Sequence, residues 1–437
     1  MKQLLLVAPH FPPVNAADMH RARVSLPHFA EFGWRAHVLT VAPRQQGEMA
    51  QDELLLQTVP ADVPVTRTTA APLWLTRRLG LGNVGLRALV PLYRAGARII
   101  GEARIDLAYF STTVFTSMAL GPIWKRRFGV PFVLDMQDPW VSDYRSPGGA
   151  TPRGKHAVAA RMHAWLEPFT MRSVDGLVTV SPGYIDTLRR RYSQIPPELC
   201  ATIPFGASAA DFDVARRLPA PFGGPRAPDG VAQAVSIGRG GSDLARAAGI
   251  LFGALADLRS RGHLRAVRLS FIGTDYAPAG RGRQSIAPIA GRHAVGDLVM
   301  EQPDRLPYFE ALRRLMDADV LLVLGSDDPQ YSPSKVYPYL LARRPIVAVL
   351  HDASPVVNLL RRAGSLVVTF GQGDDAEATR TLAPALQTLL ERLPFEPEVD
   401  EALLAPLSAR ELARQQCAVF DAVLDRHAAR KAVPCLG

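Results

Sequence analysis

Residues 317–349 constrain the fold of this chain more than any other stretch. They begin with a short apolar run, 320–324, whose length and β-branched content are typical of a buried parallel strand. A loop of Gly, Ser, Asp and Pro follows. The sequence Ser-Pro-Ser at 332–334 then indicates a helix start, because Ser is a good N-cap and Pro is tolerated in the first turn. With a second apolar run at 345–350, the stretch predicts a βαβ unit of a doubly wound α/β sheet.

Lys335 lies in the first turn of this expected helix, where a cation has the wrong sign for the helix dipole. The position is explained if an anion binds there, because backbone N–H groups, a Ser hydroxyl and an ammonium group together form a phosphate site. Only five of the 50 Lys and Arg residues are Lys, so a Lys within a motif is less expected as a generic surface cation. A solvated lysine at a helix start is the alternative interpretation.

The bulk properties exclude several classes of protein. A chain of 437 residues predicts two α/β domains of about 200 residues each. No apolar run has membrane-span length, and the N-terminal sequence is too short for a signal peptide and has Pro too early, so we expect a cytoplasmic protein. The three cysteines are far apart and in no metal spacing, which suits a reducing compartment and predicts no metal site.

The net charge of +9 fits a nucleic-acid binder, a membrane-surface protein or an enzyme with anionic substrates. The arginines are spread along the whole chain, so we rank nucleic acid last and expect no such partner. A basic amphipathic pattern over 85–100 fits a helix lying on an anionic membrane. It also fits a helix packed on its own sheet with its arginines in water, and we favour this second interpretation.

The first half of the chain opens with a β-loop-α-β pattern. An apolar run at 4–7 predicts a buried strand, and a helix over 18–32 and a strand over 35–41 are expected to follow. The first loop contains no G-x-G-x-x-G motif. It has Asn-Ala-Ala, beginning at Asn15, where such folds place small residues that let a ligand approach the backbone. Asn15 is therefore a weak candidate for a ligand contact.

Asp138 follows another apolar run, 131–136, and so lies at the carboxyl end of an expected strand, where open α/β sheets bind ligands. A helix cap or a turn explains this residue equally well.

Residues 206–230 are rich in Ala, Pro, Gly and Asp without periodicity, which predicts an interdomain linker. A strand at 234–237, a glycine-rich turn and a helix at 243–259 then restart the pattern. The turn suits a phosphate contact through Arg239 and backbone amides.

Two Rossmann-like halves joined by a linker, with the phosphate signals in the second half, are the layout of the GT-B fold. Over nearly its whole length the chain resembles glycosyltransferase family 4, the retaining GT-B enzymes. The segments that carry this resemblance are LLVAPHFPPVNAADMHRA, VPFVLDMQDPW, TIPFGASAADF, SIGRGG, FIGTDYAP and YSPSKVYPYLLARRPIVAV. The last segment is similar to the donor motif of the family.

The resemblance implies two Rossmann-like domains that face each other across a cleft. Residues 1–205 would form the acceptor domain, 206–230 the linker and 231–407 the sugar-nucleotide donor domain. Residues 408–437 would form a C-terminal helix and tail that cross back to the first domain. The implied reaction moves a hexosyl or related sugar from a nucleoside-diphosphate sugar to an acceptor hydroxyl with retention. The implied setting is cell-surface polysaccharide or glycolipid synthesis, with a carbohydrate or lipid-linked acceptor and contact with the inner face of an anionic membrane.

The resemblance also implies roles for individual residues. Arg239 and Lys335 would stabilise the charge that builds on the leaving β-phosphate, so that no metal or other cofactor is needed. The donor-binding residues would be Gly238, Gly240, Arg246, Gln330, Ser332 and Ser334. On the acceptor side the expected contacts are His10, Asn15 and Asp138. Closure of the two halves about the linker would exclude water.

The chain departs from the family pattern at three places. Arg246 is the cation nearest to the glycine turn, where the family has Lys-Gly. The two glutamates that the family places eight positions apart fall on Gln330 and Pro338. Residues 111–113 (Ser-Thr-Thr) occupy the place of a His that often holds the donor sugar. Gln330 and Pro338 favour an alternative, a non-catalytic GT-B protein that binds a nucleotide or a partner. A GT-B epimerase would need converging acid/base groups, and the sequence offers no convincing set.

Overall fold

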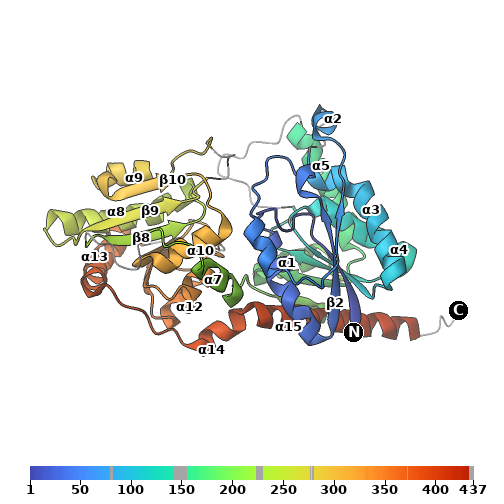
Figure 1. Ribbon diagram of the computed structural model, residues 1–437. Coiled ribbons are helices and arrows are strands. Elements are labelled where there is room, and N and C mark those ends of the chain that lie inside the picture. The colour runs from blue at the N-terminus through green and yellow to red at the C-terminus, as the bar shows by residue number, and fades with distance from the viewer. Residues whose placement is uncertain are drawn as a thin grey trace. The chain divides into compact units, whose positions relative to one another are not determined.

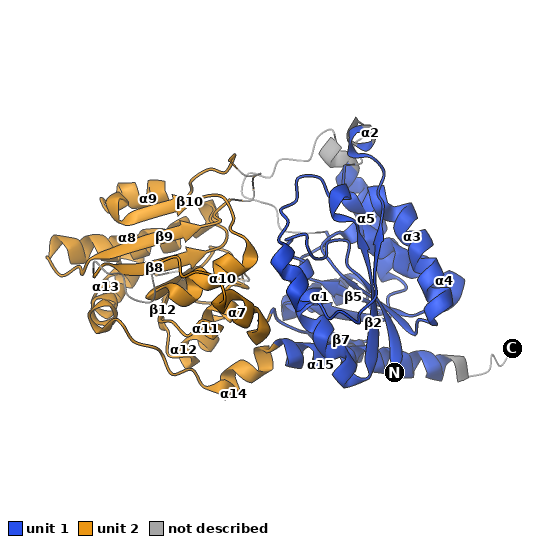
Figure 2. Ribbon diagram, in the orientation of Figure 1, with its two compact units in different colours: residues 1–205, 409–437 blue, residues 206–408 orange. Residues whose placement is uncertain are grey.

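The computed structural model describes residues 1–78, 82–141, 155–222, 230–275, 277, 280–329, 331, 333–371 and 373–432. The chain divides into two compact units, which Figure 2 shows in different colours. Unit 1 consists of residues 1–205 and 409–437, and unit 2 consists of residues 206–408. Each unit is an α/β structure with its own parallel sheet and its own apolar core.

The sheet of unit 1 has seven strands in the order β3-β2-β1-β4-β5-β6-β7, and the pairs are parallel. The order reverses between β1 and β4, the kind of place where ligands bind in open α/β sheets. The strands are β1 (Lys2–Val7), β2 (Trp34–Val41), β3 (Val65–Thr68), β4 (Leu107–Ser111), β5 (Phe132–Met136), β6 (Gly176–Thr179) and β7 (Cys200–Thr202).

Helices cover both faces of this sheet (Figure 1). The helices of unit 1 are α1 (Met19–Ser25), α2 (Leu73–Arg78), α3 (Val84–Ala103), α4 (Leu120–Phe128), α5 (Lys155–Met171), α6 (Pro182–Arg191) and α15 (Ala409–Ala432), with 3-10 turns η1 (Leu26–Phe32), η2 (Pro43–Gln45), η3 (Glu53–Thr58), η4 (Phe115–Ala119) and η5 (Pro197–Leu199). The expected helix over 18–32 thus changes to a 3-10 turn at Leu26, next to Pro27, whose missing N–H removes an α-helical hydrogen bond.

Helix α3 shows how the basic amphipathic pattern over 85–100 is used. Its side chains Leu92, Ile99 and Ile100 are buried in the core of unit 1, and Arg94 and Arg98 are exposed. The apolar side of α3 is therefore covered by its own sheet, as in the favoured interpretation of this pattern. In the described parts of the chain, no helix is both long and apolar enough to cross a bilayer.

The last helix, α15, belongs to unit 1 although it follows the whole of unit 2 in sequence. Phe420 of α15 packs its ring against Trp34 (centroid distance 5.4 Å) and Tyr109 (4.8 Å). The Trp34 Nε1 donates a hydrogen bond to Asp421 (3.0 Å). The aromatic contacts and this partly buried hydrogen bond fix the helix to the sheet.

Unit 2 has a six-stranded parallel sheet with the order β10-β9-β8-β11-β12-β13. Its strands are β8 (Ala232–Ile237), β9 (Val267–Ile272), β10 (Val299–Gln302), β11 (Val320–Leu324), β12 (Ile346–His351) and β13 (Leu366–Phe370). Its helices are α7 (Ala209–Arg216), α8 (Ala245–Ser260), α9 (Ala287–Arg292), α10 (Tyr308–Asp317), α11 (Val336–Leu341), α12 (Val357–Arg362), α13 (Asp375–Arg392) and α14 (Glu401–Leu404), with 3-10 turns η6 (Ser242–Leu244), η7 (Gly296–Leu298) and η8 (Ala405–Leu407). The predicted β-α-β stretch appears as β11-α11-β12.

The expected linker, 206–230, is not free of secondary structure. It contains helix α7, which buries Phe212 and Val214, and Tyr308 of α10 donates a hydrogen bond to Asp211 (2.8 Å). The expectation that 206–230 lacks periodic structure is therefore wrong for the helical part. The alternation of short apolar and charged residues in so short a helix conceals its helical period. Residues 223–229 lie outside the described parts of the chain.

Candidate functional site

The glycine-rich turn at the carboxyl end of β8 has a backbone that requires glycine. Gly238 and Gly241 have φ values of +129° and +132°, which other residues rarely adopt. A Cβ atom at Gly240 would clash with the Oγ of Ser285. The Gly240 N–H donates to the carbonyl of Thr274 (2.8 Å), and the Gly241 N–H donates to Ser285 Oγ (3.2 Å). These two amides are thus bonded inside the protein, so a ligand phosphate at this turn depends on side chains.

Glu301 holds in place the residues that accept hydrogen bonds from the N–H groups of the glycine turn. Its buried carboxylate accepts hydrogen bonds from the Thr274 hydroxyl (2.7 Å) and from the N–H groups of Ser285 (2.9 Å), Ile286 (2.9 Å) and Ala287 (2.7 Å). These bonds attach the start of α9 to β10. They also fix Thr274 and Ser285, the two residues that accept the amides of the glycine turn.

Arg239 extends from this turn and is oriented by two neighbours. Its guanidinium forms a two-pronged ion pair with Asp243, with distances of 2.9 and 2.7 Å, and lies 4.6 Å from the ring centroid of Tyr331. The hydrogen bond to Asp243 raises the pKa of Arg239 above its ordinary value. The side chain is thus a fixed, permanently charged fork of the kind that binds phosphate oxygens.

Lys335 approaches the same turn from α11. The helix begins at Val336, so Lys335 is its N-cap residue and not a residue of its first turn. Its Nζ donates to Ser236 Oγ (3.3 Å), and its Cδ would lie 3.7 Å from a Cβ at Gly238. Burial and the nearby positive charge of Arg239 lower the pKa of Lys335 to about 8.

The two cations therefore lie at one place, the carboxyl end of β8. Asp243 pairs with Arg239, and none of the ion pairs among the described residues includes Lys335. Two like charges in a partly buried position are unfavourable unless an anion compensates them. This arrangement can bind a doubly charged group such as a diphosphate.

A second polar cluster lies at the carboxyl edge of the sheet in unit 1. His10, in the loop after β1, has its Nδ1 at 2.8 Å from Oδ1 of Asp18. The other carboxylate oxygen of Asp18 accepts hydrogen bonds from the Thr112 hydroxyl (2.7 Å) and the Thr113 N–H (3.0 Å), both in the loop after β4. The cluster thus spans the place where the strand order reverses.

Asp18 is ionised in this cluster. Burial alone would raise its pKa, but the hydrogen bond and the positive charge from His10, together with the bonds from Thr113 and Thr112, leave the pKa below its ordinary value. An ionised carboxylate at Nδ1 favours a proton on that nitrogen, so Nε2 accepts a hydrogen bond when the imidazole is neutral and donates one when it is protonated.

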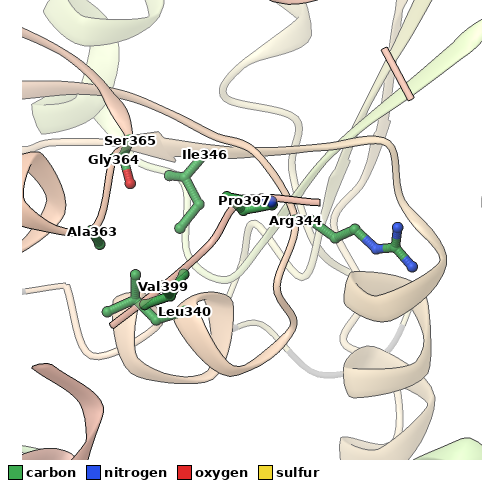
Figure 3. A pocket seen from close by; sticks show the side chains of 8 residues that line it. All are labelled: Leu340, Arg344, Ile346, Ala363, Gly364, Ser365, Pro397 and Val399. Carbon is green, nitrogen blue, oxygen red and sulfur yellow. The ribbon is translucent and has the colours of Figure 1, made fainter. Parts of the chain in front are cut away.

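The small pocket in Figure 3 is at the other end of the sheet in unit 2. Ser365 comes directly before β13 and Ile346 is the first residue of β12, so the pocket lies at the amino edge of the strands. It has room for about one water molecule. Its position and size separate it from the cations at Arg239 and Lys335, which are the better candidate site.

Comparison with known proteins finds a family match in the first half of the chain. Residues 21–206 match the model of a glycosyl transferase 4-like domain. Within the described residues, the match begins in α1 and includes the strands β2 to β7, so it covers most of unit 1. No curated protein sequence matches the chain.

Solved structures show that the chain has the GT-B fold. Trehalose 6-phosphate synthase from Burkholderia multivorans is 14% identical, with a TM-score of 0.59, and the match covers 99% of each chain. Sucrose-phosphate synthase from Thermosynechococcus elongatus is 15% identical, with a TM-score of 0.53, over 99% of this chain and 97% of that one. The Anabaena protein HepE, solved with UDP-glucose, is 17% identical with a TM-score of 0.52, over 99% of this chain and 100% of that one.

Arg246, the third cation expected at the donor site, has other partners. Its Nε donates to Asp375 (2.7 Å), and its guanidinium also bonds the carbonyls of Gly371 (2.7 Å) and Gly373 (3.2 Å). It connects α8 to the segment between β13 and α13. The nearby Asp327 has a pKa raised chiefly by burial, an effect that the charge of Arg246 opposes. The role of Arg246 is therefore mainly structural, because its guanidinium joins two segments of unit 2.

The remaining donor-side residues are Gln330, Ser332 and Ser334. Gln330 and Ser332 lie outside the described residues. Ser334 is exposed in the turn before α11, and its carbonyl accepts the N–H of Tyr337 (3.4 Å). The predicted cap from this Ser-Pro-Ser sequence is absent at Ser334, because the helix of the structure begins two residues later and is capped by Lys335 without a side-chain bond.

On the acceptor side, Asp138 is exposed at the end of β5, and partial burial and the charge of Asp18 raise its pKa. The preceding Gln137 donates to the Asp18 carbonyl (3.0 Å), which brings this loop to the His10–Asp18 pair. Asn15 lies in the same loop as His10 and is held through its N–H to the carbonyl of Ala50 (2.8 Å). The two predicted residues His10 and Asp138 thus belong to one cluster.

Sequence reasoning missed four members of these two sites: Asp18, Thr112, Thr113 and Asp243. Asp18 was interpreted only as the start of a helix. One signal was available for the two threonines, because they follow the apolar run at 107–110, and the ends of parallel strands share one edge of the sheet. Asp243 is four residues after Arg239, and the glycine turn between them folds the two side chains together.

Proposed function

We propose that this protein transfers a sugar from a nucleoside-diphosphate sugar to an acceptor hydroxyl with retention of configuration. The observation that carries the proposal is the pair of cations at the end of β8, Arg239 and Lys335, with Asp243 as the carboxylate that Arg239 engages. A diphosphate supplies the negative charge that this pair lacks. The UDP-glucose in the related HepE structure supports a sugar nucleotide as the ligand.

Arg239 and Lys335 would act on the leaving group. As the bond from the anomeric carbon to the β-phosphate breaks, negative charge develops on the phosphate oxygens. Asp243 and Tyr331 hold the guanidinium in place before this charge appears, so little reorganisation is needed. Because the two side chains supply this positive charge, we propose a reaction without a metal ion, which predicts activity that persists in EDTA.

We place the acceptor in unit 1, against His10 and Asp138. The Nε2 of His10 would accept a hydrogen bond from an acceptor hydroxyl, and the exposed carboxyl of Asp138 would bind a second one. A carbohydrate or a glycolipid head group offers several such hydroxyls, so cell-surface polysaccharide or glycolipid synthesis is the proposed pathway. Two described cysteines, Cys200 and Cys417, are free, which suits a reducing cytoplasmic location.

The alternative is a GT-B protein that binds nucleotide without catalysis. The observation that favours it is Pro338, which occupies the place of a glutamate of the donor motif and has no side chain that can accept a hydrogen bond from a ribose. Loss of such a charged acceptor costs about 1.5–3 kcal/mol of binding.

The two functions are separated by an assay in two stages. Calorimetric titration with a panel of nucleoside diphosphates identifies the base. The corresponding sugar nucleotides are then incubated with candidate acceptors, and NMR follows the anomeric signal of the donor. Product with the configuration of the donor supports the proposal. Product of inverted configuration would contradict retention, and binding without turnover or hydrolysis across the panel would support the non-catalytic alternative.

A further inference from the structure

The contacts of Lys335 leave its amine able to react with an electrophile. Its Nζ lies 3.3 Å from the Ser236 Oγ, and a hydroxyl can accept a hydrogen bond from an ammonium group or donate one to a neutral amine. Lys125 differs, because the carboxylate of Asp175 engages its Nζ (2.6 Å). Reaction at Lys125 therefore requires that an ion pair breaks first, whereas no ion pair among the described residues includes Lys335.

Gly238 provides space beside the side chain of Lys335. If a Cβ atom were added at Gly238, the Cδ of Lys335, at 3.7 Å, would be its only neighbour within 4 Å among the described residues. The side chain of Lys335 is itself partly exposed. A small molecule can therefore approach the amine along the glycine turn.

The groups that face this amine favour its neutral form. Ser236 of β8 is uncharged, and so is Tyr339 of α11, whose hydroxyl accepts the N–H of Ile237 (2.7 Å) and whose pKa is raised by burial. The charged neighbour is Arg239 of the glycine turn. Burial and this positive charge lower the pKa of Lys335 to about 8. A lowered pKa beside another cation is what activates the lysines that form imines with carbonyl compounds.

Arg239 makes this amine selective for phosphorylated molecules. Asp243 and the carbonyl of Gly240 engage part of its guanidinium, which has more N–H groups than these contacts use. The ring of Tyr331, 4.6 Å from the guanidinium carbon, helps to fix the orientation of the fork. A phosphate bound to Arg239 therefore holds the remainder of a short molecule beside Lys335.

We propose that Lys335 is a site of reversible covalent modification by phosphorylated aldehydes, whose phosphate binds Arg239. The neutral amine attacks the aldehyde carbon, and a proton passes from nitrogen to oxygen to give a carbinolamine. Loss of its hydroxyl group with the second proton of the nitrogen releases water and leaves an imine, which hydrolysis reverses. The step consumes no oxidant or reductant. Sugar phosphates in their open-chain form belong to this class of aldehyde. The modification occupies the proposed donor site, but its chemistry does not rest on sugar transfer.

Reductive trapping on the full chain tests the proposal. The protein is incubated with glyceraldehyde 3-phosphate and sodium cyanoborohydride, which reduces an imine to a stable secondary amine, and peptide mass spectrometry locates the label. We expect Lys335 to be labelled at least about tenfold faster than any other lysine of the chain. Glyceraldehyde lacks the phosphate and should label Lys335 about tenfold more slowly, because it cannot form the charge-assisted contact to Arg239. The other lysines are Lys2, Lys125, Lys155 and Lys431.

Two variants and a competitor complete the experiment. In Arg239→Gln the ratio of the two rates at Lys335 should fall to about one, because the phosphate loses its partner. The control Lys125→Arg removes a lysine held by a carboxylate and should leave the labelling of Lys335 unchanged. Inorganic pyrophosphate should protect Lys335 in the parent protein.

Two results would overturn the proposal. The first is similar labelling of all the lysines, and the second is an equal rate at Lys335 with the two aldehydes. The proposed donor site is judged separately, by calorimetric titration of nucleoside diphosphates. Diphosphate binding without preferential labelling of Lys335 would therefore reject the modification and leave the donor site in place.

Discussion

The imidazole of His10 lies with its Nδ1 2.8 Å from the buried carboxylate of Asp18, and Thr112 and Thr113 hold that carboxylate from the opposite side. The four residues come from the loops after β1 and β4. A carboxylate that is fixed in this way determines both the orientation and the tautomer of the imidazole. His10 is therefore held in a fixed orientation at the carboxyl edge of the sheet of unit 1, and Asp18 is the residue that positions it.

Replacement of Asp18 by Asn should destabilise unit 1 by about 1.5–3 kcal/mol, because an amide returns weaker hydrogen bonds than a buried carboxylate. The pKa of Asp18 is lowered in the folded state, so its ionised form stabilises the protein at pH values above the unfolded value, about 3.9. This stability is lost as the pH falls through the folded-state pKa. Chemical denaturation at a series of acidic pH values should show a smaller acid dependence in Asp18→Asn than in the parent. Equal acid dependence in the two proteins would contradict the assignment.

Removal of either cation at β8 should weaken binding of a nucleoside diphosphate. We expect Arg239→Ala and Lys335→Ala each to raise the dissociation constant about ten- to a hundredfold, because each deletes a charge-assisted contact to phosphate. Isothermal titration gives the two constants. Arg292→Ala, an exposed arginine on α9, is the matched control and should bind like the parent. Unchanged affinity in both test variants would remove the basis of the proposed donor site.

Binding of a diphosphate should also be linked to proton uptake at Lys335. Burial and Arg239 lower the pKa of Lys335 to about 8, and a bound anion would raise it again. Affinity should therefore fall as the pH rises above about 8. Titrations at that pH in buffers of different ionisation enthalpy should show proton uptake. Lys335→Arg, which keeps its charge in this range, should bind without the uptake, and an equal uptake in this variant would assign the proton elsewhere.

The same pKa shift has a consequence for stability. The folded-state pKa lies below the unfolded value near 10.4, so between about pH 8 and 10 the unfolded chain binds more protons at this site than the folded one does. The contribution of Lys335 to the free energy of unfolding therefore rises with pH in this window. Denaturation of Lys335→Met at both ends of the window should lack this contribution. A rise equal to that of the parent would show that other groups produce it.

Substitution of Gly240 by Ala should damage the glycine turn. The added Cβ would meet Ser285 Oγ and lie 3.2 Å from the Thr274 carbonyl, so overpacking should cost about 1–3 kcal/mol of stability. Displacement of the turn should also weaken diphosphate binding through Arg239. The control Gly291→Ala adds the same methyl group in α9, where nothing lies within 4 Å, and should be neutral.

The variant Gly240→Ala/Ser285→Ala separates the clash from other effects. Removal of the Ser285 hydroxyl relieves the closest contact, so the double variant should recover part of the stability that Gly240→Ala loses. Thermal unfolding of the three proteins measures this recovery. A double variant less stable than Gly240→Ala would show that the hydroxyl matters more as an acceptor for the Gly241 N–H than as a steric neighbour.

The local features of this chain follow from its sequence. The apolar run at 320–324 coincides with the observed strand β11, since a strand buried on both faces needs a continuous apolar run. The glycine turn and Lys335 likewise follow from residue type, because strand ends and helix starts have characteristic residues. Together these patterns predict two parallel sheets, which the structure contains.

The partners of the charged residues were decided by the tertiary structure. Arg246, near the glycine turn in sequence, is bonded to Asp375, and the amides of that turn are bonded to Thr274 and Ser285. Sequence spacing carries no information about such pairs, because they depend on how distant loops pack together. The sequence thus determined the two sheets and placed Arg239 and Lys335 at strand and helix ends. Only the fold determined that Arg239 has a carboxylate partner and that, among the described residues, Lys335 has none. A buried charge pairs with the group that packing brings within hydrogen-bonding distance, and packing depends on the tertiary structure.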